Sequence, residues 1–122
     1  MSDVTTPMAI ERRLKQLGVE LDEANQQLAD AELNYMTSKA TYEVHSAAER
    51  MNIKRRASEA GLKVTIAEVE DEAILACQDD MANYYTSEAI VRAARSNISR
   101  VKTQVDIARS IGTSVRVSMD LS

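Results

Sequence analysis

Residues 14–42 read LKQLGVELDEANQQLADAELNYMTSKATY, and this stretch decides the fold. Its small and apolar residues recur in alternating steps of three and four, the heptad pattern of a helix that packs along another helix. Thr6 and Pro7 precede it as a helix cap and a first helical residue. We therefore predict a long helix over residues 7–45. Its seam positions are Leu14, Leu17, Leu21, Ala24, Leu28, Ala31, Tyr35, Ser38 and Tyr42.

A second apolar stripe joins this seam in the later half of the helix. It consists of Leu33, Met36, Ala40 and Val44, again at helical spacing. A helix with apolar residues on two faces packs against more than one neighbour, so we expect that behaviour at this end.

Two further helices are predicted from the remaining pattern. The seam is lost over residues 45–52, where we place a turn, and it returns over residues 52–83. A third helix is expected over residues 87–111, with Ser87 as its cap. Gly18 and Gly61 are candidate positions for bends.

The end of the chain changes its period. Gly112 is typical of the residue that follows a helix, and residues 113–122 then alternate apolar and polar side chains. This alternation predicts a short extended tail. The fold class we expect is all-α, a single helical domain over residues 1–122, in which an elongated helical hairpin is joined by a third helix.

Composition limits the core and suggests self-association. The 122 residues include four Tyr but no Phe and no Trp, so the core must be built from small and aliphatic side chains. A single small subunit then buries little surface, and assembly into a homo-oligomer makes up the deficit. The seam carries no clear code for the number of subunits.

Catalytic and metal chemistry find little support in the residues. Cys77 is the only cysteine and His45 the only histidine, and neither has the sequence setting of an activated nucleophile or base. The acidic run of residues 68–72 lacks the spacing and the glycine of a calcium loop. We expect a protein that is not an enzyme, without a metal or another cofactor. No apolar run reaches the roughly 20 residues of a membrane span, and no signal-peptide pattern occurs, so a cytoplasmic protein with no membrane partner is expected.

Charge is sorted along the chain and supplies the candidate binding residues. The net charge is −7 over residues 64–88 but +4 over residues 89–122, within a total of −4. Exposed cations of this kind contact nucleic-acid phosphates; pairing with the acidic helix is the alternative, and the sequence does not decide between them. Tyr84 and Tyr85 either stack on bases or close a small core. The candidate nucleic-acid-binding residues are Arg50, Lys54, Arg55, Arg56, Lys63, Arg92, Arg95 and Lys102, with Arg109 on the same helix face and Arg100 and Arg116 nearby.

The arrangement of these segments resembles the UvsY-like recombination mediators of bacteriophages. The resemblance covers roughly residues 20 to 117. It comprises the Tyr-containing helix of residues 35–42, the basic segment NIKRRASEA of residues 52–60, a charged Ala-rich helix and the closing run ARSIGTSVR of residues 108–116. It implies a ring-like oligomer that binds single-stranded DNA and helps to load a recombinase onto strands covered by single-strand-binding protein. Lys54, Arg55 and Arg56 match the family's basic segment, which implies phosphate contact.

The leading hypothesis is therefore a DNA-recombination accessory protein that binds single-stranded DNA without sequence specificity, in the host cytoplasm if phage-encoded. The acidic middle of the chain departs from this pattern. One alternative is a small acidic helical adaptor or inhibitor of a host protein, of the counter-defence type, which uses Glu68, Glu70, Asp71 and Glu72. Another is a structural coiled-coil component.

Overall fold

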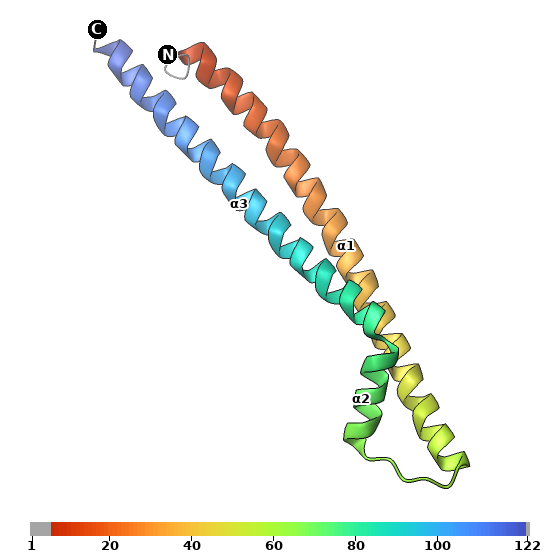
Figure 1. Cartoon of the computed structure of the whole chain (residues 1–122). Helices are drawn as coiled ribbons and strands as arrows, with labels where there is room; N and C mark the ends of the chain where they lie inside the picture. Colours follow the sequence, from red (N-terminus) through yellow and green to blue (C-terminus); the bar gives the residue numbers. More distant parts are fainter. Residues whose placement is uncertain (1–5, 122) are drawn as a thin grey trace. The chain divides into compact units, whose positions relative to one another are not determined.

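The computed structural model describes residues 6–121 and is built from helices (Figure 1). The three helices are α1, Pro7–Glu59, α2, Ile66–Ala76, and α3, Gln78–Asp120, and no strand occurs within the described residues. The all-α class is confirmed.

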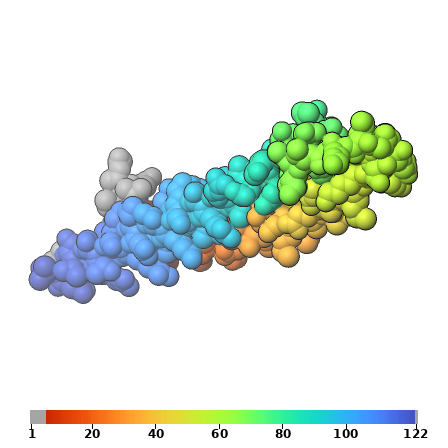
Figure 2. Space-filling model, turned by 90° about the horizontal axis from the view of Figure 1, so that it is seen from below, coloured from red at the N-terminus to blue at the C-terminus, as the bar shows by residue number. Residues whose placement is uncertain are grey.

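The chain divides into two compact units. The terminal unit contains the chain up to Asp30 together with the chain from Arg92 onward, and the central unit is Ala31–Val91. The terminal unit therefore pairs the first part of α1 with the last part of α3. The central unit pairs the rest of α1 with α2 and the beginning of α3, and Figure 2 shows α2 lying along the last turns of α1.

In the terminal unit the predicted seam of α1 forms the packing surface, and in the central unit the packing surface of α1 continues past that seam to Ile53. In the terminal unit Leu17 is fully buried with Val101 and Ala108 of α3, and Leu14, Leu21 and Val105 pack against this cluster. In the central unit Ile53 is buried with Val69 and Ala73 of α2, beside Val64. Residues early in α1 meet residues late in the chain, so the packed segments run antiparallel within each unit.

The start of α1 agrees with the prediction. Pro7 is its first residue, and the hydroxyl of Thr6 accepts a hydrogen bond from the Ala9 amide at 3.1 Å. This bond satisfies one of the amides that have no partner inside the first turn of a helix.

The predicted turn at residues 45–52 is wrong, because α1 continues to Glu59. The least exposed positions step from half-buried Ser38 and Tyr42 to buried Ser46, two steps of four in succession, which is a stutter in the heptad pattern. Ser46 is polar but only 4% exposed. A polar residue at a shifted seam position resembles a break in the sequence, although the helix continues through it.

The predicted single helix over residues 52–83 is also wrong, because these residues span the end of α1, a connection, α2 and the start of α3. Gly61 ends α1 with φ of 70°, and the amides of Gly61 and Leu62 donate to the carbonyls of Ser58 and Ala57 at 3.1 and 2.8 Å. This is the Schellman arrangement, which requires a left-handed residue and so favours glycine. Gly61 therefore supplies the turn. The hydroxyl of Thr65 then caps α2 by accepting from the Glu68 amide.

The helix predicted over residues 87–111 is the middle of α3. Ser87 is not its cap: it is 2% exposed, and its hydroxyl donates to the carbonyl of Tyr84 at 2.7 Å. Nor is α3 a third helix beside a hairpin, because it is itself the partner of α1. As at Ser46, a small polar residue in the seam has the sequence signature of a helix end, although the helix continues through it.

The extended tail predicted over residues 113–122 is also wrong, because α3 continues to Asp120; Ser122 lies outside the described residues. Gly112 occupies a seam position, where a Cβ atom would lie 3.3 Å from Cγ2 of Ile10. It therefore allows close helix approach instead of ending the helix. Val115, half-buried one step further on, continues the seam.

Replacing Gly18 and replacing Gly61 by alanine should change the stability of the protein in opposite directions. Gly18 is exposed inside α1, and no neighbouring atom lies within 4 Å of the place that a Cβ atom would occupy, so no contact opposes a side chain there. Gly18→Ala should raise the free energy of unfolding by about 0.5–1 kcal/mol, the helix-propensity difference. Gly61→Ala should lower it by about 1 kcal/mol, because alanine is strained at positive φ. Urea unfolding followed by circular dichroism at one fixed protein concentration measures both, and destabilisation by Gly18→Ala would contradict this description of α1.

Candidate nucleic-acid interface

The structure separates the candidate basic residues into two groups. Arg50, Lys54, Arg55 and Arg56 lie on the last turns of α1, and Lys63 follows in the connection to α2, all within the central unit. Arg92, Arg95 and Lys102 lie on α3 within the terminal unit. The central unit has eleven acidic and six basic side chains, so its basic group lies in an acidic setting.

Arg50 serves the packing of the central unit. Its Nη1 atom donates to the hydroxyl of buried Ser46 at 2.7 Å, and its Nε atom lies 3.7 Å from Oε1 of Glu70 on α2. The guanidinium group thus satisfies a buried hydroxyl and connects two helices. This is the pairing with the acidic helix that the sequence left open, and at Arg50 it is present.

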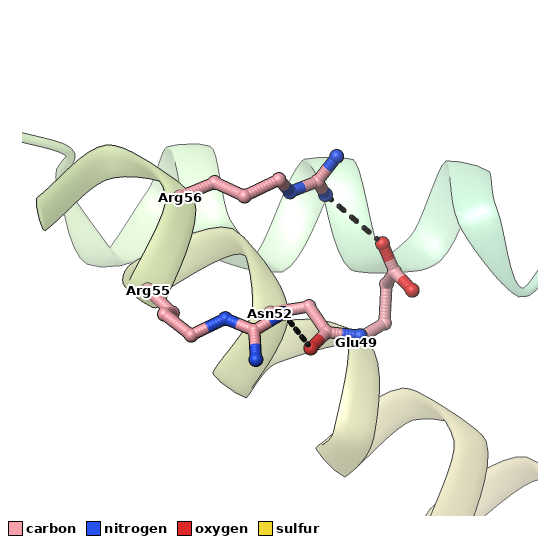
Figure 3. A network of polar contacts seen from close by, with 4 residues as sticks. All are labelled: Glu49, Asn52, Arg55 and Arg56. Atoms are coloured by element: carbon pink, nitrogen blue, oxygen red, sulfur yellow. Dashed lines mark hydrogen bonds and ion pairs between the residues drawn. The ribbon is translucent and has the colours of Figure 1, made fainter. Parts of the chain in front are cut away.

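Arg55 and Arg56 both have partners on α1 (Figure 3). Arg55 donates to Oδ1 of Asn52, and Arg56 pairs with Oε1 of Glu49, each at 3.3 Å. Consecutive helical residues point about 100° apart, so Lys54, Arg55 and Arg56 extend to different sides of α1. They do not form one binding face, and at the C-terminal end of a helix such cations also complement the helix dipole.

Lys54 and Lys63 are the two cations of this group whose ammonium groups have no partner among the described residues. Both side chains are exposed, and neither has an ion pair or a hydrogen bond to another residue within 6–121.

On α3 the basic residues form an ordered line, which we call the basic stripe. Its members follow one another at intervals of seven residues, or about 10.5 Å along the helix, and each is exposed at a position next to the seam. Arg92 lies one turn before the first member. The basic stripe consists of Arg95, Lys102, Arg109 and Arg116.

The sequence pattern predicted the basic stripe only as far as Arg109. A helix that ends at Gly112 leaves Arg116 near the stripe but outside it. Treating Gly112 as a seam residue continues the heptad to Val115 and places Arg116 in line with Arg109. Lys102, Arg109 and Arg116 form no ion pair with a carboxylate of the described chain.

The far end of the stripe borders a small groove in the terminal unit. This groove holds about 130 Å³ and is lined by Pro7, Ile10, Glu11, Leu14, Arg109, Gly112 and Arg116. Glu11 is the one acidic residue in the lining, against two guanidinium groups, so the groove carries a net positive charge. Arg100 lies on another face, where it donates twice to Oδ1 of Asn97.

The tyrosines form a cluster inside the central unit. The ring of Tyr84 lies 5.7 Å from the rings of Tyr35 and Tyr42 on α1, and 5.2 Å from Tyr85. Such distances are those of packed aromatic pairs. Tyr84 thus closes a small core, whereas Tyr85 is 57% exposed.

The environment of Tyr84 generates a pH prediction. A hydrogen bond with the Tyr35 side chain, followed by desolvation and by negative neighbours, raises the pKa of Tyr84 from 10.0 to about 12. The folded state thus favours the neutral phenol, and this stabilisation is present below pH 10 and is lost as the pH rises through about 12. Absorbance titration of tyrosinate should show one component near 12 that Tyr84→Phe removes and that Tyr35→Phe moves toward 10. A late component that survives Tyr84→Phe would contradict the assignment.

The residues considered for catalysis have structural partners. His45 Nδ1 lies 2.6 Å from Oδ2 of Asp80, which joins α1 to α3 within the central unit. Cys77 is buried at the break before α3, and burial, followed by the charges of Asp80 and Glu49, raises the pKa of its thiol. Within residues 6–121 no three acidic, histidine or cysteine side chains are grouped as metal ligands. That the protein is not an enzyme stays a prediction.

None of the helices described in residues 6–121 combines the length and the apolar character that crossing a membrane requires.

Comparison with known proteins adds no relative to this picture. No protein-family description, no curated protein and no solved structure matches the chain. The resemblance to recombination mediators therefore stays a prediction from the sequence pattern.

Proposed function

We propose that this protein is an accessory factor of DNA recombination, a mediator that binds single-stranded DNA without sequence specificity as a homo-oligomer. The observation that carries the DNA-binding part is the basic stripe of α3. Three of its members, Lys102, Arg109 and Arg116, are exposed and form no carboxylate pair within the described residues. The recombination role draws on the resemblance described from the sequence.

The stripe suits contact with a sugar-phosphate backbone. Its charges repeat along one line, and phosphates are the sequence-independent feature of a nucleic-acid strand. In the central unit, exposed Tyr85 offers an aromatic ring on which a base can stack. The ring of Tyr84 is packed against Tyr42 and is not available for stacking. Binding is therefore expected to rest on charge more than on base stacking, and to weaken steeply with salt.

Self-association would convert a weak contact into useful affinity. Three or four phosphate contacts per chain give modest binding, whereas several linked copies bind one strand with avidity. The acidic central unit is repelled by DNA and leaves a surface for a basic protein such as a recombinase or a single-strand-binding protein.

A second candidate function is supported by α2. Glu68, Asp71 and Glu72 are exposed and form no ion pair within the described chain, whereas Glu70 is occupied by Arg50. An exposed acidic helix of this kind fits the adaptor or inhibitor that would bind a basic groove of a host protein. A structural coiled-coil component, the third hypothesis from the sequence, needs neither charged surface.

Neutralising the stripe tests the DNA-binding proposal. The variant Lys102→Gln/Arg109→Gln/Arg116→Gln should weaken binding to a labelled single-stranded oligonucleotide at least tenfold at low salt. The slope of log affinity against log salt should fall by about 2, at roughly 0.7 for each lost phosphate contact. Fluorescence anisotropy at several salt concentrations, with a duplex as competitor, measures both quantities.

The single variants Lys102→Gln and Lys39→Gln are a matched pair beside the triple variant, because each removes an exposed lysine without an ion pair in residues 6–121. Lys39→Gln should leave affinity and slope unchanged. If the wild-type protein fails to bind the single strand even at low salt, the proposal is wrong and the acidic face of α2 becomes the candidate surface.

A further inference from the structure

The outward side of α1 in the central unit is an apolar face without a partner. Four of its large side chains, Leu33, Met36, Val44 and Met51, are 68%, 66%, 65% and 72% exposed. Ala40 and Ala48 lie between them and are also exposed. We call these six residues the outer stripe.

Helix geometry places the outer stripe on one line. Its residues follow one another at steps of three, four, four, four and three, so at about 100° per residue they stay within roughly 60° of a common direction. Half-buried Tyr35 and Tyr42 and buried Ile53 point to the opposite side of α1. Every charged residue between Leu33 and Met51 falls outside this arc. Such a face is typical of a helix that packs on two sides.

The chain as a whole exposes more surface than a compact monomer of its mass. The chain has an accessible area of 8853 Å², whereas a compact monomer of 13.5 kDa exposes about 6,500 Å². A stable protein interface removes about 800 Å² from each partner. The excess of roughly 2,300 Å² thus exceeds what one such interface needs.

From this face we infer that a second copy of the chain docks antiparallel on the outer stripe. The inference rests on the homo-oligomer part of the proposed function and names its surface. The spacing of the stripe is the same in both directions about position 42, so a two-fold pairing sets Leu33 against Met51, Met36 against Ala48 and Ala40 against Val44. Two-fold interfaces require such self-complementarity. Two of the three pairs set a large side chain against alanine, which allows the side chains to interdigitate.

Charge on the flank of the stripe agrees with this register. The pairing brings Glu32 of one copy to within about half a helical turn of Lys54 of the other, on the same side of the contact, and symmetry repeats the pair. Opposite charges beside an apolar helix contact fix its orientation. Lys54, which has no ion pair within its own described chain, then serves self-association and not DNA.

Mass measurement in solution tests the surface. Light scattering after gel filtration should give the wild-type protein at least twice the mass of one chain. Val44→Glu should reduce that mass at least twofold, because the stripe would bury an unpaired carboxylate near its two-fold axis. Val19→Glu is the matched control, since Val19 is a 57% exposed valine of α1 in the terminal unit, and it should keep the wild-type mass. Helix content by circular dichroism should be unchanged in both variants.

Disulfide trapping tests the register of the two chains without relying on a substitution that could impair folding. With Cys77 replaced by serine, mixing Leu33→Cys with Met51→Cys should give a crosslinked dimer on mild oxidation. Neither variant alone should do so, because equal positions lie about 27 Å apart in an antiparallel pair. A Leu33→Cys dimer formed alone, or a Val44→Glu protein of wild-type mass, would overturn the inference.

The same preparations separate this surface from the DNA-binding proposal. A 33–51 crosslink in a protein that binds no single strand would uphold the surface and contradict DNA binding. A monomeric wild-type chain that binds the strand would overturn the surface and the homo-oligomer part of the proposed function, but would uphold DNA binding.

Discussion

Burial of one narrow seam along α1 is the constraint on which both units depend. The seam is built from leucine, alanine, tyrosine and serine, and its buried partners on α2 and α3 are small or β-branched, among them Ala73, Val101 and Ala108. Side chains of this size let two helices approach closely, and Gly112 against Ile10 is the extreme case. In the terminal unit, which has no aromatic residue, this approach is stabilised by contact along the length of the helices, whereas tyrosine rings pack between the helices of the central unit.

Because the seam is narrow, it also determines which side chains remain on the surface. Two packed helices can cover only one face of each other, so large apolar side chains such as Met36 and Met51 stay exposed on the far side of α1. The charged residues take the flanks, where the heptad keeps Arg95, Lys102, Arg109 and Arg116 in line. The proposed DNA contact and the proposed self-association therefore use different faces that follow from one repeat.

The sequence predicted the helical class, the seam from Leu14 to Tyr42 and the cap at Thr6, because apolar spacing and capping are local signals. It misplaced three boundaries where the seam uses a residue that usually marks an end, namely Ser46, Ser87 and Gly112, and it missed the turn at Gly61. Among the candidate site residues, the heptad spacing correctly predicted that Lys102 lies on the exposed face of a helix. No local sequence signal identified Ser46 and Glu70 as the partners of Arg50. Such contacts depend on which segments meet in space.

The register of the seam in the terminal unit is the central claim, and disulfide trapping tests it most directly. With Cys77 replaced by serine, Ile10→Cys/Gly112→Cys should oxidise to a crosslink within one chain, because a Cβ atom at 112 lies 3.3 Å from the Ile10 side chain. Ile10→Cys/Val105→Cys, displaced by one heptad or about 10.5 Å, should not. Equal crosslinking of both pairs, or a crosslink only between chains, would contradict the antiparallel pairing of α1 with α3.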